Sequence, residues 1–294
     1  RTAAEAARAA GRRIAATGTH PLSDWRTTAT FPKVAYLRLE RNYQQLAREQ
    51  VVSGCHVHVG FDDPEDAIEV MNRVRAWLPS ILALSANSPF WMGEITGYCS
   101  YRNRIWQRWP IAGMPGSFRN RSEYDALVKL LLATGSIDDP ARIYWDVRPS
   151  NKFNTLEVRI ADVCMNVEDS LLVAALIRAL CQACHQQARE GVPADELRPE
   201  LLQAAVWRAA RYGGSDELID VVGERSLPAG EMFSKLMEFV GPTLDQRGET
   251  QQVTDLLDQV RSRGTGASRQ LEVYERTGRL EDVVDLIVAE TVSI

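Results

Sequence analysis

Hydrophobic and polar positions alternate strictly in three short runs of this chain, at residues 55–59, 143–148 and 155–160. A period of two places successive side chains on opposite faces of a strand. One face of each run is apolar, and the other carries side chains that bind cations or anions: His56, His58, Asp146, Arg148, Glu157 and Arg159. The pattern predicts three strands that share one polar face if they pair in a single sheet.

Helical spacing of apolar positions accounts for most of the remaining chain. Asp63 is a typical N-cap and Pro64 suits the first helical position, so a helix is predicted to begin there and to kink at Pro79. Further helices are predicted over 2–16, 32–50, 122–133 and 167–187, with helix continuing almost to the end.

One segment has no clear period. Residues 87–118 are rich in glycine, proline, aromatic residues and arginine, and are predicted to form ordered loops. Together the elements favour one α+β domain over residues 1–294 with a helical C-terminal half, in which helices pack on the apolar face of the sheet.

Composition narrows the class of protein. The chain has 294 residues, of which 45% are hydrophobic and 25% charged, as is typical of globular proteins. Its 34 basic and 39 acidic side chains give a net charge of −5, which argues against a nucleic-acid partner. Five cysteines, an odd number, argue against a disulfide framework and predict a reducing, cytoplasmic location. No apolar run is long enough to predict a membrane span.

The polar faces of the predicted strands indicate metal-assisted phosphoryl chemistry. A carboxylate beside an imidazole suits a divalent cation, and neighbouring guanidinium groups suit phosphate or carboxylate oxygens. Two other interpretations stay open. An antiparallel sheet with one solvated face would carry the same charges for solubility alone. A zinc hydrolase could use His56 and His58, although only His20 and His185 remain to complete such a site.

Several longer motifs extend along the chain. They are 54–60 (GCHVHVG), 84–91 (LSANSPFW), 96–102 (TGYCSYR), 145–150 (WDVRPS), 155–159 (TLEVR) and 264–267 (GTGA). In this order they resemble the type 2 glutamate–cysteine ligases, also called carboxylate–amine ligases. That family is similar in fold to glutamine synthetase, so the resemblance implies an antiparallel sheet whose polar concave face holds ATP and divalent cations.

The resemblance implies roles for the polar side chains. His56 and Glu157 would be metal ligands, with Glu157 also among the catalytic residues. Arg159 would be catalytic by neutralising charge on the phosphoryl group in transfer.

The remaining roles concern the substrates. His58 and Arg148 would lie near the nucleotide phosphates, and Arg102 or Arg104 would hold a substrate carboxylate. The implied cofactors are ATP and Mg²⁺ or Mn²⁺.

The implied reaction joins the γ-carboxylate of L-glutamate to an amine, most simply L-cysteine. Because a carboxylate is a poor electrophile, ATP would first convert it to an acyl phosphate, which the amine then attacks with release of phosphate. The partners would be these small molecules, and the resemblance is compatible with a homodimer.

Two departures from the family pattern bear on this expectation. The family normally opens with a strand of clustered glutamates that bind metal, whereas this sequence begins at Arg1 without such a strand and is expected to be a piece of a longer chain. Ile95 stands where an acidic residue is expected before residues 96–97. If the glutamates are absent from the native protein, a catalytically silent relative that binds nucleotide or amino acid is the alternative function.

Overall fold

The computed structural model describes residues 2–293 and places the three alternating runs in one sheet. The strands are β1 (Val57–Gly60), β7 (Thr155–Val158) and β6 (Val147–Pro149), in the order β1-β7-β6, and both pairings are antiparallel. The run 143–148 is divided, because its first half forms β5 (Tyr144–Trp145) and pairs in parallel with β4 (Ala112–Gly113). The predicted antiparallel sheet is therefore confirmed, with a break within one of its runs.

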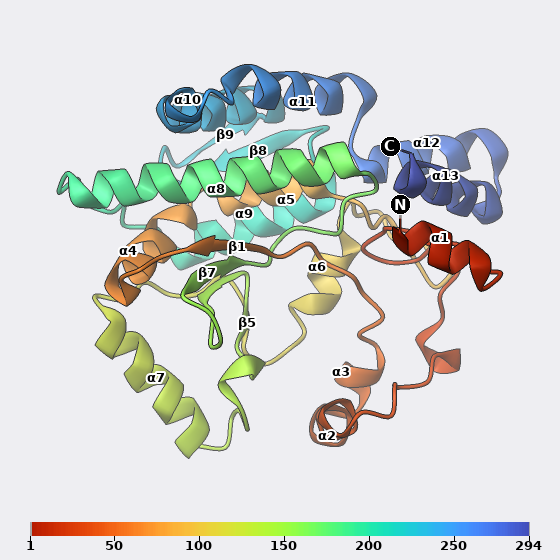
Figure 1. Cartoon of the computed structure of the whole chain (residues 1–294), viewed down its shortest axis with the longest axis horizontal. Helices are drawn as coiled ribbons and strands as arrows, with labels where there is room; N and C mark the ends of the chain where they lie inside the picture. Colours follow the sequence, from red (N-terminus) through yellow and green to blue (C-terminus); the bar gives the residue numbers. More distant parts are fainter. Residues whose placement is uncertain (1, 294) are drawn as a thin grey trace.

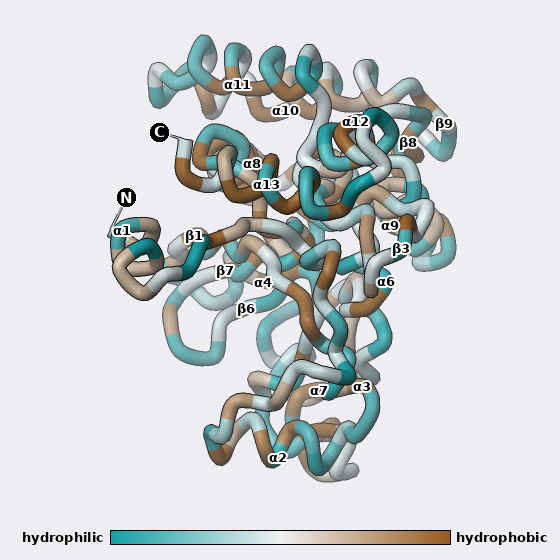
Figure 2. The backbone as a smooth tube through the Cα atoms, turned by 90° about the vertical axis from the view of Figure 1, so that its right-hand side faces the viewer, coloured by the Kyte–Doolittle hydropathy of each residue, from teal (hydrophilic) through white to brown (hydrophobic). Residues whose placement is uncertain are grey.

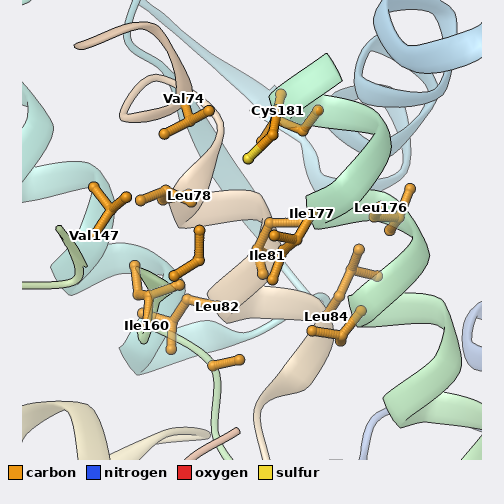
Figure 3. Close-up of a cluster of buried hydrophobic side chains, with 14 of the residues drawn as sticks. Val74, Leu78, Ile81, Leu82, Leu84, Val147, Ile160, Leu176, Ile177 and Cys181 are labelled. Carbon is orange, nitrogen blue, oxygen red and sulfur yellow. The ribbon is translucent and has the colours of Figure 1, made fainter. Parts of the chain in front are cut away.

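Helices pack on the apolar face of this sheet. They are α4 (Pro64–Val74), α5 (Leu78–Ser85) and the long helix α8 (Val167–Arg189). Side chains of α4 and α5 face those of α8, with sheet residues on the other side (Figure 3), and the labelled members are almost fully buried: Val74, Leu78, Ile81, Leu82, Leu84, Val147, Ile160, Leu176, Ile177 and Cys181. The α+β class follows from this arrangement.

The predicted helix from Pro64 starts as expected but does not continue past residue 75. Asp63 caps it by accepting a hydrogen bond from the main-chain N–H of Glu65. Instead of a kink at Pro79, a turn at residues 75–77 interrupts the helix, which restarts with Pro79 in the first turn of α5. Proline is favoured there because the first turn needs no intrahelical N–H donor.

A second layer of helices covers α8 (Figures 1 and 2). It contains α10 (Ala229–Arg247) and α11 (Thr250–Arg263), while α9 (Pro199–Tyr212) packs against α5. The prediction of helix almost to the end is wrong at one place, where strands β8 (Glu217–Asp220) and β9 (Arg225–Pro228) form a hairpin.

The chain ends come close together in space. Helix α12 (Gly266–Thr277) packs against α13 (Leu280–Val292), and α13 lies near α1 (Thr2–Ala9) in Figure 1. The segment after α1 is bonded to α13, since Arg13 pairs with Asp285 at 2.6 Å and the Ala16 N–H donates to Thr291 at 2.9 Å.

Two other predicted segments differ from the structure. The segment 87–118 is not all loop, since it contains α6 (Tyr101–Trp106), capped by Ser100, and the short strands β2 (Phe90–Trp91) and β3 (Glu94–Ile95). The helix expected over 32–50 is divided into α2 (Val34–Tyr43) and α3 (Gln45–Arg48).

The helix predicted over 122–133 is present as α7 (Arg121–Ala133), capped by Asn120. Two short 3-10 helices, Trp25–Thr27 and Pro140–Arg142, complete the elements. Within the described residues, none of the helices combines the length and apolar character needed to cross a membrane.

Candidate active site

Two rows of three side chains cross the polar face of the sheet. In the first row the strand register sets Glu157 on β7 between His58 on β1 and Arg148 on β6. This row brings a carboxylate, an imidazole and a guanidinium group from three distant segments to one line across the sheet. The shared polar face predicted from the alternating runs is therefore present.

The second row lies one step along the same face, just beyond the named strands. The main-chain N–H of Arg159 donates to the carbonyl of Asp146 at 2.7 Å, and the Cys55 N–H donates to the Ala161 carbonyl at 3.0 Å. The first bond continues the β6–β7 pairing and sets Asp146 opposite Arg159. The second is shifted by one residue from the β1–β7 register, and His56 joins this row through its contact with Glu157. We use the name polar array for the six side chains His56, His58, Asp146, Arg148, Glu157 and Arg159.

Glu157 is the centre of the polar array. Its Oε1 accepts from Nη1 of Arg159 at 2.5 Å and lies 3.2 Å from Nδ1 of His56. Its Oε2 accepts from Nε of Arg148 at 3.0 Å, while Nε2 of His58 lies 3.6 Å from Oε1. Four of the six other site residues named from the sequence thus converge on one carboxylate.

The charges around Glu157 fix its protonation state. Burial alone would raise the pKa of Glu157, but the hydrogen bond from His56 and the charges of Arg159 and Arg148 outweigh burial and lower the pKa to about 2. Burial lowers the pKa of His56, against the opposing effect of Glu157. At neutral pH this geometry therefore favours an ionised Glu157 beside a neutral His56 that donates from Nδ1.

Two further contacts hold the outer members of the first row. Arg148 donates from Nη1 to the carbonyl of Ile143 at 2.8 Å, so its guanidinium group is bound at both ends. Nδ1 of His58 lies 2.8 Å from the hydroxyl of Thr155, and its Nε2 is the nitrogen near Oε1 of Glu157.

Arg102 lies against the main chain that follows β7. It is almost fully buried, and it donates to the carbonyl oxygens of Ile160 at 3.0 Å and Arg159 at 3.1 Å. Enclosed in this way, the Arg102 guanidinium group holds the main chain of residues 159 and 160, and its expected contact with a substrate carboxylate stays a prediction. Arg104 is only half-buried and donates to Oε1 of Gln107 at 2.5 Å, and its substrate role stays a prediction.

Asp162 lies beneath the array as the counterion of Arg102, with 3.7 Å between its Oδ1 and Nη1. It also accepts hydrogen bonds from the Asn87 N–H at 2.9 Å, the Ser88 hydroxyl at 2.7 Å and the Ser100 hydroxyl at 2.9 Å. The motifs at 84–91 and 96–102 are thus joined by one buried carboxylate. Sequence analysis missed Asp162, because it follows the last strand and belongs to no alternating run.

The C-terminal motif 264–267 joins the same network from the other end of the chain. Gln270 on α12 donates to Oδ1 of Asn87 at 2.7 Å, and a Cβ added to Gly266 would lie 2.2 Å from that oxygen. The glycine is required because α12 approaches Asn87 this closely.

Asp146 is a second carboxylate to which sequence analysis gave no role, although it lies on the polar face of its run. It is almost fully buried, and its Oδ2 makes no hydrogen bond within the described part of the chain. Burial raises the pKa of Asp146 to about 6, against the charges of Arg102, Arg104 and Arg159. Asp146 therefore titrates closer to neutrality than an ordinary aspartate.

The residues that are present do not by themselves complete a metal centre. Among residues 2–293, no group of three or more His, Cys, Asp or Glu side chains is placed to hold a metal ion. His56 and Glu157 are adjacent, but both oxygens of Glu157 accept hydrogen bonds from arginines. His185 does not support the zinc interpretation, because its Nε2 lies 2.9 Å from Oδ2 of Asp66 and it does not join His56 and His58.

Two solved structures share this fold. A glutamate–cysteine ligase from Francisella tularensis in complex with AMP matches with a TM-score of 0.67 and 14% identity, over 94% of this chain and 72% of that one. The Pup ligase PafA in complex with ADP matches with a TM-score of 0.50 and 14% identity, over 87% of this chain and 61% of that one. At these identities the likeness shows the fold alone.

Sequence comparison identifies the family. The model described as glutamate–cysteine ligase family 2 matches residues 1–286. A Frankia alni protein named "Putative glutamate--cysteine ligase 2-2" is 47% identical over 294 residues, which are 100% of this chain and 76% of that relative. The chain belongs to glutamate–cysteine ligase family 2, and the resemblance stated from its motifs is confirmed.

Proposed function

We propose that this protein is an ATP-dependent carboxylate–amine ligase that joins the γ-carboxylate of L-glutamate to an amine, most simply L-cysteine, through an acyl phosphate. The observation that carries the proposal is the convergence of Arg148, Arg159, His56 and His58 on Glu157 across one sheet. Family membership and the nucleotide complexes of the two structural relatives support the use of ATP.

The two arginines are the groups that would handle the transferred phosphoryl group. Phosphoryl transfer places negative charge on the oxygens of the transferred group. Guanidinium groups stabilise that charge by their positive charge and hydrogen bonds and take no covalent part in the reaction. Arg148 and Arg159 are held in place by Glu157 on the polar face. Glu157 would therefore orient both arginines, in addition to the metal role that the resemblance implies for it with His56.

The histidines would act at the edge of the same surface. Because Nδ1 of His58 is bonded to Thr155, its Nε2 is the nitrogen that could meet a nucleotide phosphate. Arg104 is the proposed partner of a substrate carboxylate, since within residues 2–293 its guanidinium group donates a hydrogen bond to the neutral Gln107 and pairs with no carboxylate. Mg²⁺ would enter with ATP, because Mg²⁺ is commonly held by substrate phosphates and few protein carboxylates.

The test measures release of ADP from ATP and Mg²⁺ in the presence of L-glutamate, with and without a panel of amines that includes L-cysteine. ADP release that depends on one amine supports the ligase and identifies the second substrate. Arg159→Lys keeps the positive charge but loses the planar guanidinium group and its paired N–H donors, and is expected to lower turnover at least about a hundredfold. An Arg159→Lys variant with full turnover would contradict the assigned role.

A second candidate function is a silent relative that binds nucleotide or amino acid without turnover. It is favoured by the engagement of both Glu157 oxygens with arginines and by the lack of a three-ligand metal group among residues 2–293. Nucleotide binding measured by calorimetry, together with no ADP release for any amine, would select this function over the ligase.

A further inference from the structure

A cavity of about 340 Å³ lies apart from the polar array, between the end of α4, the start of α9 and the loop 112–117. None of the six side chains of the array lines it. One residue of its wall is nevertheless hydrogen-bonded to a member of the polar array, because the carbonyl of Gly113 accepts from the main-chain N–H of Asp146 at 2.8 Å. The volume is within the range that small-molecule sites occupy.

The cavity is lined by a buried arginine that has no counterion. Arg75 is 6% exposed, and no carboxylate within Thr2–Ser293 lies at ion-pair distance from it. Its Nε donates to the Asn72 carbonyl and its Nη1 to the Pro115 carbonyl, both at 3.0 Å. Nη2 makes no hydrogen bond with the described residues and is left to the cavity.

An uncompensated buried cation is costly, so this arrangement needs an explanation. Burial lowers the pKa of Arg75, and no neighbouring acid raises it. Guanidinium groups keep their charge even so, and a buried charge is normally paired with an opposite one. The two main-chain carbonyls satisfy part of the hydrogen bonding of Arg75 but carry no net negative charge. The missing element is an anion.

The other lining residues define what kind of anion would fit. No aspartate or glutamate lines the cavity, so a ligand with its own positive charge would find no partner. Leu202, Val206 and Met114 offer apolar contacts, and the amides of Gln107 and Gln203 offer neutral hydrogen bonds. A bare inorganic anion would leave the apolar wall unused.

We propose that this cavity is a binding site for a small organic carboxylate, with the carboxylate on Nη2 of Arg75 and the hydrocarbon chain against Leu202 and Val206. A guanidinium group and a carboxylate form charge-assisted hydrogen bonds, which are the strongest polar contacts available here. The site lies outside the polar array and therefore adds to the proposed ligase function without depending on it.

The test uses 4-methylpentanoate and its neutral counterpart 4-methylpentanamide as matched probes in isothermal titration calorimetry near neutral pH. The carboxylate is expected to bind at least about tenfold more tightly than the amide, because only the carboxylate pairs with Arg75. Arg75→Gln is expected to remove this preference. Equal binding of the two probes, or no binding of the carboxylate up to the millimolar range, would overturn the proposal.

A second variant guards against loss of folding in Arg75→Gln, because Arg75 also holds the Pro115 carbonyl. Gln203 is exposed at the cavity, so Gln203→Glu adds a negative charge there without disturbing the core. It is expected to weaken carboxylate binding several-fold. The matched control Gln259→Glu makes the same change on an exposed face of α11 away from the cavity and should leave binding unchanged. Equal affinities in the two variants would contradict the placement of the ligand.

Discussion

Arg102 holds the main chain of Arg159. Nη2 of Arg102 lies 3.1 Å from the carbonyl oxygen of Arg159, and both guanidinium groups lie over the ring of Trp106, at 5.7 and 5.4 Å from its centroid. One arginine is thus buried beneath the sheet end while the other reaches Glu157 on the polar face. The buried residue fixes the position from which the proposed catalytic residue extends.

Gly54 provides the space that Arg102 needs. A Cβ at position 54 would lie 2.2 Å from Nη2 of Arg102, whereas a Cβ at Gly60 meets no heavy atom within 4 Å. Gly54→Ala should displace the guanidinium group and lower the free energy of unfolding by about 2 kcal/mol, with at least about a tenfold loss of turnover. Urea denaturation and ADP release measure the two effects.

Gly60→Ala is the matched control for this substitution. It makes the same chemical change in the same segment, and its free energy of unfolding should stay within about 0.5 kcal/mol of the parent protein. If both alanine variants keep full stability and turnover, Arg102 does not position Arg159.

Glu157 gives the protein a stability that depends on pH. Its folded-state pKa of about 2 lies below the ordinary value of 4.5, so its pairing stabilises the fold above pH 4.5 and is lost as the pH falls from 4.5 toward 2. Glu157→Gln should therefore lower the free energy of unfolding by about 2 kcal/mol at neutral pH, and the difference should shrink in acid. Denaturant titrations across this range test it.

The control for Glu157 is an exposed glutamate. Oε2 of Glu281 lies 4.0 Å from Nε of Arg279, and both side chains are largely exposed. Glu281→Gln should therefore change the free energy of unfolding little at any pH. A Glu157→Gln variant whose stability deficit is the same in acid and at neutral pH would show that the ion pairs of Glu157 are not the cause.

The strands and their shared polar face could be predicted because a period of two is visible even in runs of five residues. His58, Glu157 and Arg148 alternate with apolar neighbours, so their faces follow from the sequence, and their register then sets them side by side. Helix α6 could not be found in this way, because six residues are too few to display a helical period, and one of its two arginines is buried while the other is half-buried.

Burial of charged side chains was the other limit of prediction. The motif that contains Arg102 indicated a binding residue, but whether a guanidinium group faces substrate or main chain depends on tertiary contacts with residues 159 and 160. Asp162 carries no local signal at all, since its partners Asn87, Ser88 and Ser100 come from two other segments. Such networks are set by long-range packing rather than by local pattern.

Binding of Mn²⁺ tests the metal role expected for His56 and Glu157. With both Glu157 oxygens accepting from arginines, we expect Mn²⁺ to bind the nucleotide-free protein only in the millimolar range. His56→Ala should leave that affinity unchanged. Electron paramagnetic resonance of free Mn²⁺ measures it, and a tight site that disappears in His56→Ala would instead establish His56 as a ligand.

Asp146 should give a pH dependence of the opposite sign to that of Glu157. Burial raises its folded-state pKa to about 6, above the ordinary 3.8, so its stabilising contribution is complete below pH 3.8 and is lost as the pH rises through about 6. The asparagine in Asp146→Asn cannot ionise, so the variant does not lose stability in this way. The free energy of unfolding of the variant minus that of the parent should therefore rise by up to about 3 kcal/mol between pH 3.8 and neutrality, whatever that difference is in acid. Denaturant titrations at several pH values measure the difference, with the exposed Asp258→Asn as the control. A stability difference that stays constant with pH would show that Asp146 does not titrate in this range.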